Sequence, residues 1–270
     1  MQIDKAGKAY WDEVWVDGPL PLPINPKETH LDNYVNVRFH EFFSSLFSKT
    51  DVRGKLLLEV GCAKSAWLPY FSQQFGFRVS GLDYSETGCR QSEEILSNAG
   101  VQGEIVCADF FAPPASLIGK FDALVTFGVV EHFADTRACI EALLRFLKLG
   151  GLLVTIIPNM TGWIGTIQKQ VNRPVYDIHV PLDARSLMKV HQQVRVKVLS
   201  CQYFLFTNFG VPNLNGLDPR SPGWKIKNIF LKILFHMSKL TWWWESAFRQ
   251  LPPNRWTSPY IHCVAQKERE

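Results

Sequence analysis

A short apolar run that turns sharply at a glycine, residues 56–67 (LLLEVGCAKSAW), constrains the fold of this chain more than any other stretch. The run leads through Glu59 to Gly61, and a helix is expected from about Trp67. Its length and the glycine favour a strand over a helix. A strand that turns directly into a helix gathers backbone N–H groups beside the turn, where a glycine permits close approach because it has no side chain. The stretch therefore predicts a nucleotide-type cradle.

Strands and helices are expected to alternate from this turn onward. Further strands are predicted over 78–82, 104–107, 121–127 and 152–157. The helices between them are predicted from about 66 to a stop at Gly76, from the N-cap Ser85 to Gly100, and from the N-cap Asp135 to the Gly150-Gly151 pair. This alternation predicts an α/β fold with a doubly wound, mostly parallel sheet.

Ligands of such sheets bind beyond the C-terminal ends of the strands. The residues expected there are Gly61, Asp83, Asp109, Gly128 to His132, and Pro158-Asn159. Asp83 follows Gly61 by 22 residues, close to the roughly 20-residue interval at which an acidic side chain meets the hydroxyl pair of a ribose. A carboxylate suits that task because it accepts hydrogen bonds from both hydroxyls. A simple strand-end cap is the alternative role for Asp83.

Composition argues against several classes of protein. The 270 residues, 46% of them hydrophobic, are enough to bury a sizeable core, and one α/β domain with additions is expected. A net charge of +4 without a concentrated Lys/Arg stripe argues against a nucleic-acid partner. The first residues lack a signal-peptide pattern, and no apolar run has the length of a transmembrane helix. We therefore expect a cytoplasmic protein.

The cysteines predict neither a zinc site nor a redox pair. Their positions, none of which forms a C-x-x-C pair, are Cys62, Cys89, Cys107, Cys139, Cys201 and Cys263. Buried, reduced thiols are the expected state, and no metal site is predicted.

Five spaced motifs then point to a family. They are Glu59-Val60-Gly61-Cys62, Leu82-Asp83, Ala108-Asp109-Phe110, Gly128-Val129-Val130-Glu131-His132-Phe133 and Leu149-Gly150-Gly151-Leu152. Their order resembles that of the class I S-adenosylmethionine-dependent methyltransferases over about residues 55–200, and the segment 259–265 is similar to that family's last, antiparallel strand. The resemblance implies a seven-stranded sheet. A dinucleotide-binding Rossmann enzyme fits less well because G-x-G-x-x-G is absent.

The resemblance implies S-adenosylmethionine as the cofactor, with S-adenosylhomocysteine as its product. Gly61 and its neighbours would approach the methionine part, Asp83 would bind the ribose hydroxyls, Asp109 would reach the adenine amino group and Phe110 would line the adenine slot. The predicted cofactor-binding residues are Glu59, Gly61, Cys62, Ala63, Asp83, Tyr84, Asp109, Phe110, Phe127 and Gly128, with Tyr10 and Trp11 closing over the cofactor or packing the cap.

One departure from the family concerns the turn. The family usually has further glycines where this chain has Ala63 and Ser65. Both side chains are small, so we expect the turn to stay tight and to bind the cofactor with a shifted backbone.

Two histidines are candidate bases. Methyl transfer from a sulfonium needs mainly in-line positioning, but an O–H or N–H nucleophile can also need a base. His132 follows the fourth strand, with Glu131 beside it as an orienting or helix-start acid, and His179 lies in a connection that often lines the acceptor pocket in this family. The alternative roles are a helix-capping histidine at 132 and a hydrogen-bonded loop residue at 179.

The segment 224–250 combines apolar residues at helical spacing with interleaved lysines and three consecutive tryptophans, Trp242 to Trp244. We interpret it as an inserted helix that packs on the domain and lines the acceptor pocket; a membrane-surface helix contacting lipid through 224–244 is the alternative. A single domain, 1–270, is then divided into an N-terminal helical cap (1–50), a Rossmann-like core (51–215), an inserted helical lid before the last strand (216–256), and the last strand and tail (257–270).

The predicted function is methyl transfer from S-adenosylmethionine to a small, hydrophobic or aromatic acceptor, in keeping with secondary metabolism. The methylated atom, the acceptor and the oligomeric state stay open. The alternatives are a lipid- or quinone-type methyltransferase at a membrane surface and a cofactor-binding but inactive partner subunit.

Overall fold

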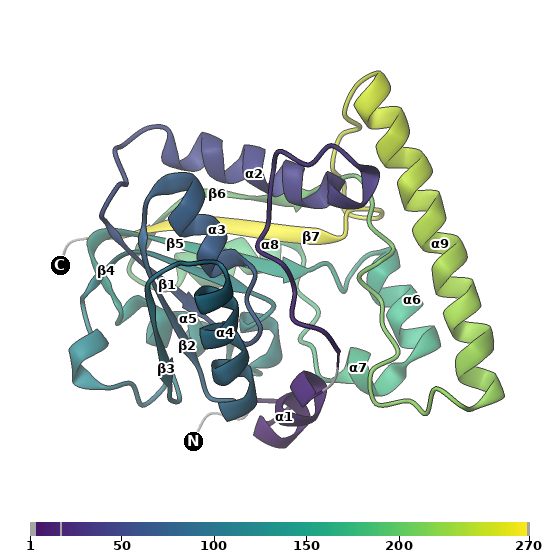
Figure 1. Ribbon diagram of the computed structural model, residues 1–270, viewed down its shortest axis with the longest axis horizontal. Helices are drawn as coiled ribbons and strands as arrows, with labels where there is room; N and C mark the ends of the chain where they lie inside the picture. Colours follow the sequence, from purple (N-terminus) through teal and green to yellow (C-terminus); the bar gives the residue numbers. More distant parts are fainter. Residues whose placement is uncertain (1–3, 17, 269–270) are drawn as a thin grey trace.

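The computed structural model describes residues 4–16 and 18–268, whose strands form one sheet in the order β3-β2-β1-β4-β5-β7-β6 (Figure 1). The strands are β1 (Leu56–Val60), β2 (Arg78–Asp83), β3 (Gly103–Cys107), β4 (Phe121–Phe127), β5 (Leu147–Pro158), β6 (Val196–Phe204) and β7 (Tyr260–Lys267). Strands β1 to β5 pair in parallel, whereas β7 lies antiparallel between β5 and β6. The predicted mostly parallel, seven-stranded sheet with an antiparallel last strand is confirmed.

Helices cover both faces of this sheet. They are α1 (Lys8–Val16), α2 (Tyr34–Phe47), α3 (Trp67–Phe75), α4 (Glu86–Asn98), α5 (Thr136–Leu144), α6 (Trp163–Val171), α7 (Arg173–Asp177), α8 (Ala184–Gln192) and α9 (Pro222–Ala247), with short 3-10 turns η1 (Leu31–Asn33), η2 (Ala115–Leu117) and η3 (Val130–His132). Phe43 of α2 and Phe71 of α3 pack into one core cluster, and Ile140 of α5 and Leu187 of α8 pack into the other. The sheet is therefore buried on both sides.

Local signals set most helix ends. The Ser85 hydroxyl accepts the backbone N–H of Gly88 at 3.2 Å, and the Asp135 carboxylate accepts that of Ala138 at 3.0 Å, so both predicted N-caps are confirmed. Gly76 ends α3 in the left-handed conformation, as predicted.

The end of α5 is a correction. The predicted helix extended to Gly150-Gly151, but α5 ends at Leu144 and β5 begins at Leu147. Leu147 pairs with Phe121 of β4, and the register then shifts before Ala123. A Cβ at Gly151 would lie 2.9 Å from the carbonyl oxygen of Lys148. The glycine pair therefore marks a strand irregularity where backbones approach closely, not a helix stop.

The inserted helix before the last strand is confirmed as α9, a 26-residue helix at the edge of the molecule (Figure 1). Its indole at Trp242 is 1% exposed and donates to the carbonyl of Thr207 at 2.9 Å. Its inner side also packs Leu231 and Leu234 against Val171 of α6. The domain boundaries at 50, 215 and 256 stay a prediction. No helix within residues 4–16 and 18–268 has the length and hydropathy needed to cross a bilayer.

Candidate functional site

A cavity of about 420 Å³ opens at the C-terminal ends of β1, β2 and β4, with α1 along one side. This is where the strand order reverses between β1 and β4, the place where doubly wound sheets bind ligands. Ten of the predicted site residues line it: Trp11, Glu59, Gly61, Ala63, Asp83, Tyr84, Phe110, Phe127, Gly128 and His132. The volume falls within the range of small-molecule sites.

The turn after β1 forms the floor of the cavity. Gly61 has φ +77°, and a Cβ there would lie 2.5 Å from Cγ2 of Val129 in the turn after β4. Both the backbone conformation and the contact therefore require glycine. Its N–H donates to the carbonyl of Leu82 at 2.8 Å, which ties the cradle to the end of β2.

Two glycines on neighbouring elements make room for the larger residues of this turn. A Cβ at Gly88 of α4 would lie 2.4 Å from Cβ of Ala63, and a Cβ at Gly81 of β2 would lie 2.5 Å from Sγ of Cys62. The side chains missing at 81 and 88 thus compensate for those present at 62 and 63. The turn stays compact although it lacks the family's usual second glycine.

Ser65 has a defined role in the turn. Its hydroxyl donates to the buried carboxyl of Glu59 at 2.6 Å and accepts the backbone N–H groups of Trp67 and Leu68 at 3.0 and 3.2 Å. The serine caps α3 and connects it to β1. Burial raises the pKa of Glu59 to about 8, while the Ser65 hydrogen bond opposes the shift.

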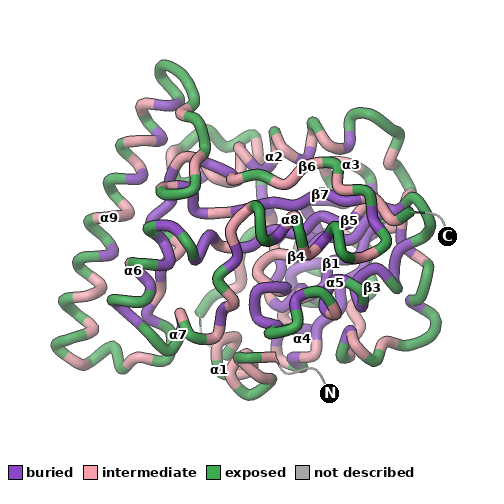
Figure 2. The backbone as a smooth tube through the Cα atoms, turned by 180° about the vertical axis from the view of Figure 1, so that it is seen from behind, coloured by how far each residue is buried: buried purple, intermediate pink, exposed green. Residues whose placement is uncertain are grey.

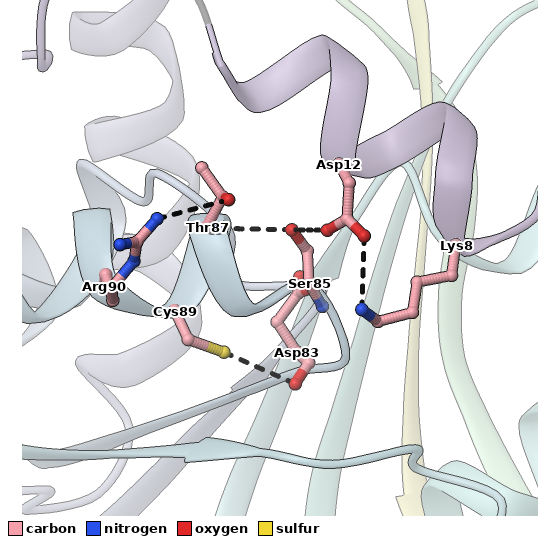
Figure 3. A network of polar contacts seen from close by, with 8 residues as sticks. Lys8, Asp12, Asp83, Ser85, Thr87, Cys89 and Arg90 are labelled. Atoms are coloured by element: carbon pink, nitrogen blue, oxygen red, sulfur yellow. Dashed lines mark hydrogen bonds and ion pairs between the residues drawn. The ribbon is translucent and has the colours of Figure 1, made fainter.

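Asp83 lines the cavity and belongs to a network of polar contacts that runs through Ser85 to Asp12 and Lys8 (Figure 3). One carboxylate oxygen accepts from the backbone N–H of Ala63 at 3.0 Å, and the other accepts from that of Ser85 at 2.8 Å. A carboxylate has about four acceptor positions, so each oxygen keeps a lone pair. Ser85 in turn donates to Asp12 of α1 at 2.6 Å, and Asp12 accepts from Lys8 at 3.1 Å. Burial raises the pKa of Asp83.

Aromatic side chains form most of the remaining wall. Trp67 stacks on Phe127 with ring centroids 4.7 Å apart, and Phe110 meets Phe133 edge to face at 5.3 Å. Trp15, Trp67 and Phe133 were not among the predicted site residues, although all three line the cavity; Val129, which also lines it, falls within the predicted range Gly128 to His132. Trp67 and Phe133 follow the ends of β1 and β4 by a few residues, and this position was their signal; Trp15 lies on α1, far from any strand end.

Four predicted residues are not among the side chains that line the cavity. Cys62 is fully buried behind the turn, and Asp109 is exposed, with its carboxylate accepting the N–H of Phe111 at 2.9 Å. Tyr10 packs edge to face on Trp11 at 5.1 Å. His179 lies behind His132, with ring centroids 4.5 Å apart.

The two candidate histidines therefore occupy one cluster with Glu131. His132 is 4% exposed and faces the cavity, and Trp11 packs on it edge to face at 4.9 Å. Burial lowers the pKa of His132 to about 3 and also lowers that of His179, so both imidazoles are neutral near pH 7. Burial raises the pKa of Glu131 to about 8.

Comparison with known proteins agrees with this architecture. Residues 58–155 match a family model described as a methyltransferase domain. That range runs from β1 into β5 and includes the cradle, Asp83 and the Glu131-His132 turn. Residues 58–155 form a methyltransferase domain of the class I S-adenosylmethionine-dependent type. The predicted family is confirmed.

Among curated relatives, this methyltransferase is 31% identical over 106 residues to a ubiquinone biosynthesis O-methyltransferase of Thiobacillus denitrificans, covering 38% of this chain and 44% of that one. It is 28% identical over 115 residues to a sphingolipid C9-methyltransferase of Candida albicans, covering 37% and 22%. The chain thus matches less than half the length of either relative.

A solved structure extends the comparison of the fold. Coclaurine N-methyltransferase, bound to N-methylheliamine and S-adenosylhomocysteine, superposes with a TM-score of 0.59 over 94% of this methyltransferase and 78% of that chain. Sequence identity is 14%, so the likeness concerns the fold.

Proposed function

We propose that this methyltransferase transfers the methyl group of S-adenosylmethionine to a small apolar or aromatic acceptor. The observation that carries the proposal is the single cavity in which a strand-to-helix cradle, a buried carboxylate and an aromatic wall meet. When bound, the cofactor supplies an electrophilic methyl group on a sulfonium. The protein's part is to align the acceptor and to keep water out of the cavity.

The residues present fit this cofactor. Each Asp83 oxygen keeps a lone pair for a ribose hydroxyl, and the absence of a Cβ at Gly61 allows a ligand to approach the backbone. Tyr84 and Phe110 offer flat apolar surface near Asp83, as an adenine ring needs. His132, neutral and at the cavity wall, is the proposed base for an acceptor that must lose a proton.

Calorimetry with S-adenosylhomocysteine tests the proposal. Asp83→Ala should weaken binding by about 1–3 kcal/mol because hydrogen bonds to a charged group are lost. Asp183→Ala is the matched control, since Asp183 caps α8 outside the cavity. Absence of binding by the unaltered protein would refute the proposal. Binding without methyl transfer to any of a panel of phenols, amines and lipids would favour the inactive partner subunit.

The outer face of α9 supports a second candidate function, methyl transfer at a lipid surface. Ile226, Ile233 and Leu240 recur every seven residues and are 70%, 57% and 68% exposed. Figure 2 shows exposed positions along the whole length of this helix. The face also includes Ile229, Phe230, Met237 and Trp243. A continuous apolar stripe on an exposed helix is typical of an interfacial helix.

The charges beside the stripe favour an anionic lipid surface over a second copy of this chain. Helix α9 carries Lys225, Lys227 and Lys232, whereas Lys239 is ion-paired with Asp32; Glu245 is the one acidic residue of the helix. Glu245 is 7% exposed and turned inward, where it accepts from the hydroxyl of Tyr34 at 3.0 Å. Two such faces packed together would bring like charges close. The curated relatives named above for ubiquinone and sphingolipid are consistent with a lipid acceptor.

Sedimentation with vesicles tests the lipid candidate. The protein should bind vesicles of phosphatidylserine and phosphatidylcholine more strongly than vesicles of phosphatidylcholine alone, and less at high salt. Ile233→Glu should abolish binding. Leu149→Glu, at a residue of equal 57% exposure on β5, should not. If both variants lose vesicle binding equally, or if neither loses it, a role for α9 in lipid binding is refuted.

A further inference from the structure

The turn after β4 carries the adjacent residues Glu131 and His132, and the connection after α7 brings His179, which is remote in sequence, beside them. Their ligand atoms all lie within 4.8 Å of one another, and Nε2 of His132 is 3.9 Å from a carboxylate oxygen of Glu131. The backbone N–H of Val180 donates to the carbonyl of Glu131 at 2.6 Å, which joins the two segments. The juxtaposition is therefore built into the backbone.

Both imidazoles are oriented in the way that metal ligands require. Nδ1 of His132 lies 3.1 Å from the carbonyl oxygen of Ile178, and Nδ1 of His179 lies 2.7 Å from that of Val175. A carbonyl only accepts, so Nδ1 carries the proton in both rings and Nε2 carries a free lone pair. A hydrogen bond from the second ring nitrogen to a carbonyl is the usual outer-shell support of a metal-bound histidine.

The carboxylate of Glu131 lacks any comparable partner. Its side chain is 1% exposed, and neither oxygen accepts a hydrogen bond from another described residue. A buried carboxyl group without hydrogen-bond partners is costly in either protonation state, because the lost hydration is not replaced. A cation between this carboxylate and the two Nε2 atoms would remove that cost.

We propose that Glu131, His132 and His179 bind one divalent transition-metal ion of the zinc class. Two imidazoles and one carboxylate form a mixed nitrogen and oxygen set that favours Zn²⁺ or Co²⁺ over Mg²⁺, which prefers oxygen ligands. The ligand atoms already lie within 4.8 Å of one another, and all three groups are buried.

The ion would leave at least one coordination position on the cavity side, because His132 itself lines the cavity. This role rests on the proposed methyl transfer: an acceptor oxygen in that position would be held and would lose its proton more readily. With the ion bound, Nε2 of His132 is a ligand, so the metal would take over from this imidazole the task of promoting proton loss. In the transfer an O–CH₃ bond forms, the S–CH₃ bond of the donor breaks, and the acceptor's proton passes to solvent. The metal site itself does not depend on that reaction.

Titration with Co²⁺ tests the site directly, since cobalt bound by nitrogen and oxygen ligands absorbs visible light. Untagged protein, freed of metal with a chelator, should develop visible absorption that saturates at one ion per chain. His179→Gln and Glu131→Gln should each weaken Co²⁺ binding by more than the roughly 10–100-fold loss seen when only an outer-shell partner is removed. His236→Gln is the control, because His236 is exposed on α9 and far from the cluster in sequence.

The unaltered protein alone can overturn the proposal: no saturable absorption with Co²⁺, and no tight binding of Zn²⁺ by calorimetry, would refute it whether or not the variants fold. Binding that survives both substitutions in folded protein would also refute it. S-Adenosylhomocysteine binding by the metal-free protein is measured in parallel. If the protein binds S-adenosylhomocysteine but no metal, the metal site is refuted and the proposed function is not. If it binds metal but no S-adenosylhomocysteine, the proposed function is refuted and the metal site is not.

Discussion

The cavity and the outer face of α9 are both built from aromatic and aliphatic side chains. They differ in how these side chains pack and in the polar groups that lie beside them. Around the cavity, Trp67 and Phe127 stack against each other beside the polar groups of Asp83 and the turn. On α9, Ile226 and Leu240 point outward with lysines as their polar neighbours. The first arrangement suits one oriented small molecule, and the second suits a broad apolar surface. Aromatic and aliphatic content alone therefore does not separate ligand binding from surface docking.

The largest expected effect is a difference in the free energy of unfolding between substitutions on the buried and on the exposed side of α9. Trp242→Ala should lower the free energy of unfolding by about 3–5 kcal/mol because it empties a buried indole site. Trp243→Ala should change it by about 0.5 kcal/mol or less, since Trp243 is 57% exposed. Urea denaturation followed by circular dichroism measures both. Similar losses would mean that the outer face of α9 also stabilises the fold, which would break the contrast.

The cavity floor provides the next test. Gly61→Ala should cost about 1–2 kcal/mol for the left-handed backbone and about 1–3 kcal/mol more for overpacking on Val129. Gly119→Ala is the control, with φ +62° and no atom near the added Cβ, so only the backbone cost applies. Thermal denaturation and calorimetry with S-adenosylhomocysteine would report the losses. Adding Val129→Ala should restore part of the stability of Gly61→Ala; no restoration would contradict the contact.

A smaller difference is expected between the serine that caps α3 beside the cavity and the serine that caps α9. Ser65→Ala should cost about 1–2 kcal/mol because it removes two accepted N–H groups and the partner of a buried carboxyl. Ser221→Ala should cost about 1 kcal/mol or less, since the Ser221 hydroxyl accepts only the N–H of Trp224, at 3.1 Å. Paired urea titrations measure the gap, and a larger loss at Ser221 would argue against the role given to Ser65.

The smallest effect is a pH dependence at the cavity. The pKa of Glu59 is raised from its ordinary value of 4.5 to about 8, so the folded protein binds a proton that the unfolded chain releases between these values. The free energy of unfolding should therefore fall as pH rises across this window, by about 1 kcal/mol between pH 6.5 and 7.5. Glu59→Gln should remove that part of the slope. An unchanged slope in the variant would exclude Glu59 as its source.

Sequence patterns predicted most of the fold because their signals are local. Gly76, Ser85 and Asp135 each act within a few residues of their own position, so these helix ends could be located from the sequence. The end of α5 could not, because Leu147 suits a helix face and a strand equally well. Pairing of Leu147 with Phe121, a contact across the sheet, decides between them.

The site was predictable in part for the same reason. Residues at strand ends, such as Asp83 and Phe127, were found from the order of elements. The proximity of Glu131 to His179 depends on how the connection after α7 returns to the sheet, and no spacing in the sequence encodes it. The outward position of Asp109 likewise follows from the turn geometry after β3, in which Phe110 takes the inner side.

Helix α1 has no buried residue, although Trp11 and Trp15 form part of the cavity wall. Its attachments include the Asp12 hydrogen bond from Ser85 and the bond from Gln91 to the carbonyl of Trp15 at 2.7 Å. A segment without buried residues opens far more often than the whole domain unfolds. We therefore expect the time a ligand stays bound to be governed by the detachment of this one helix. Residence time and thermal stability should then vary independently among variants of α1.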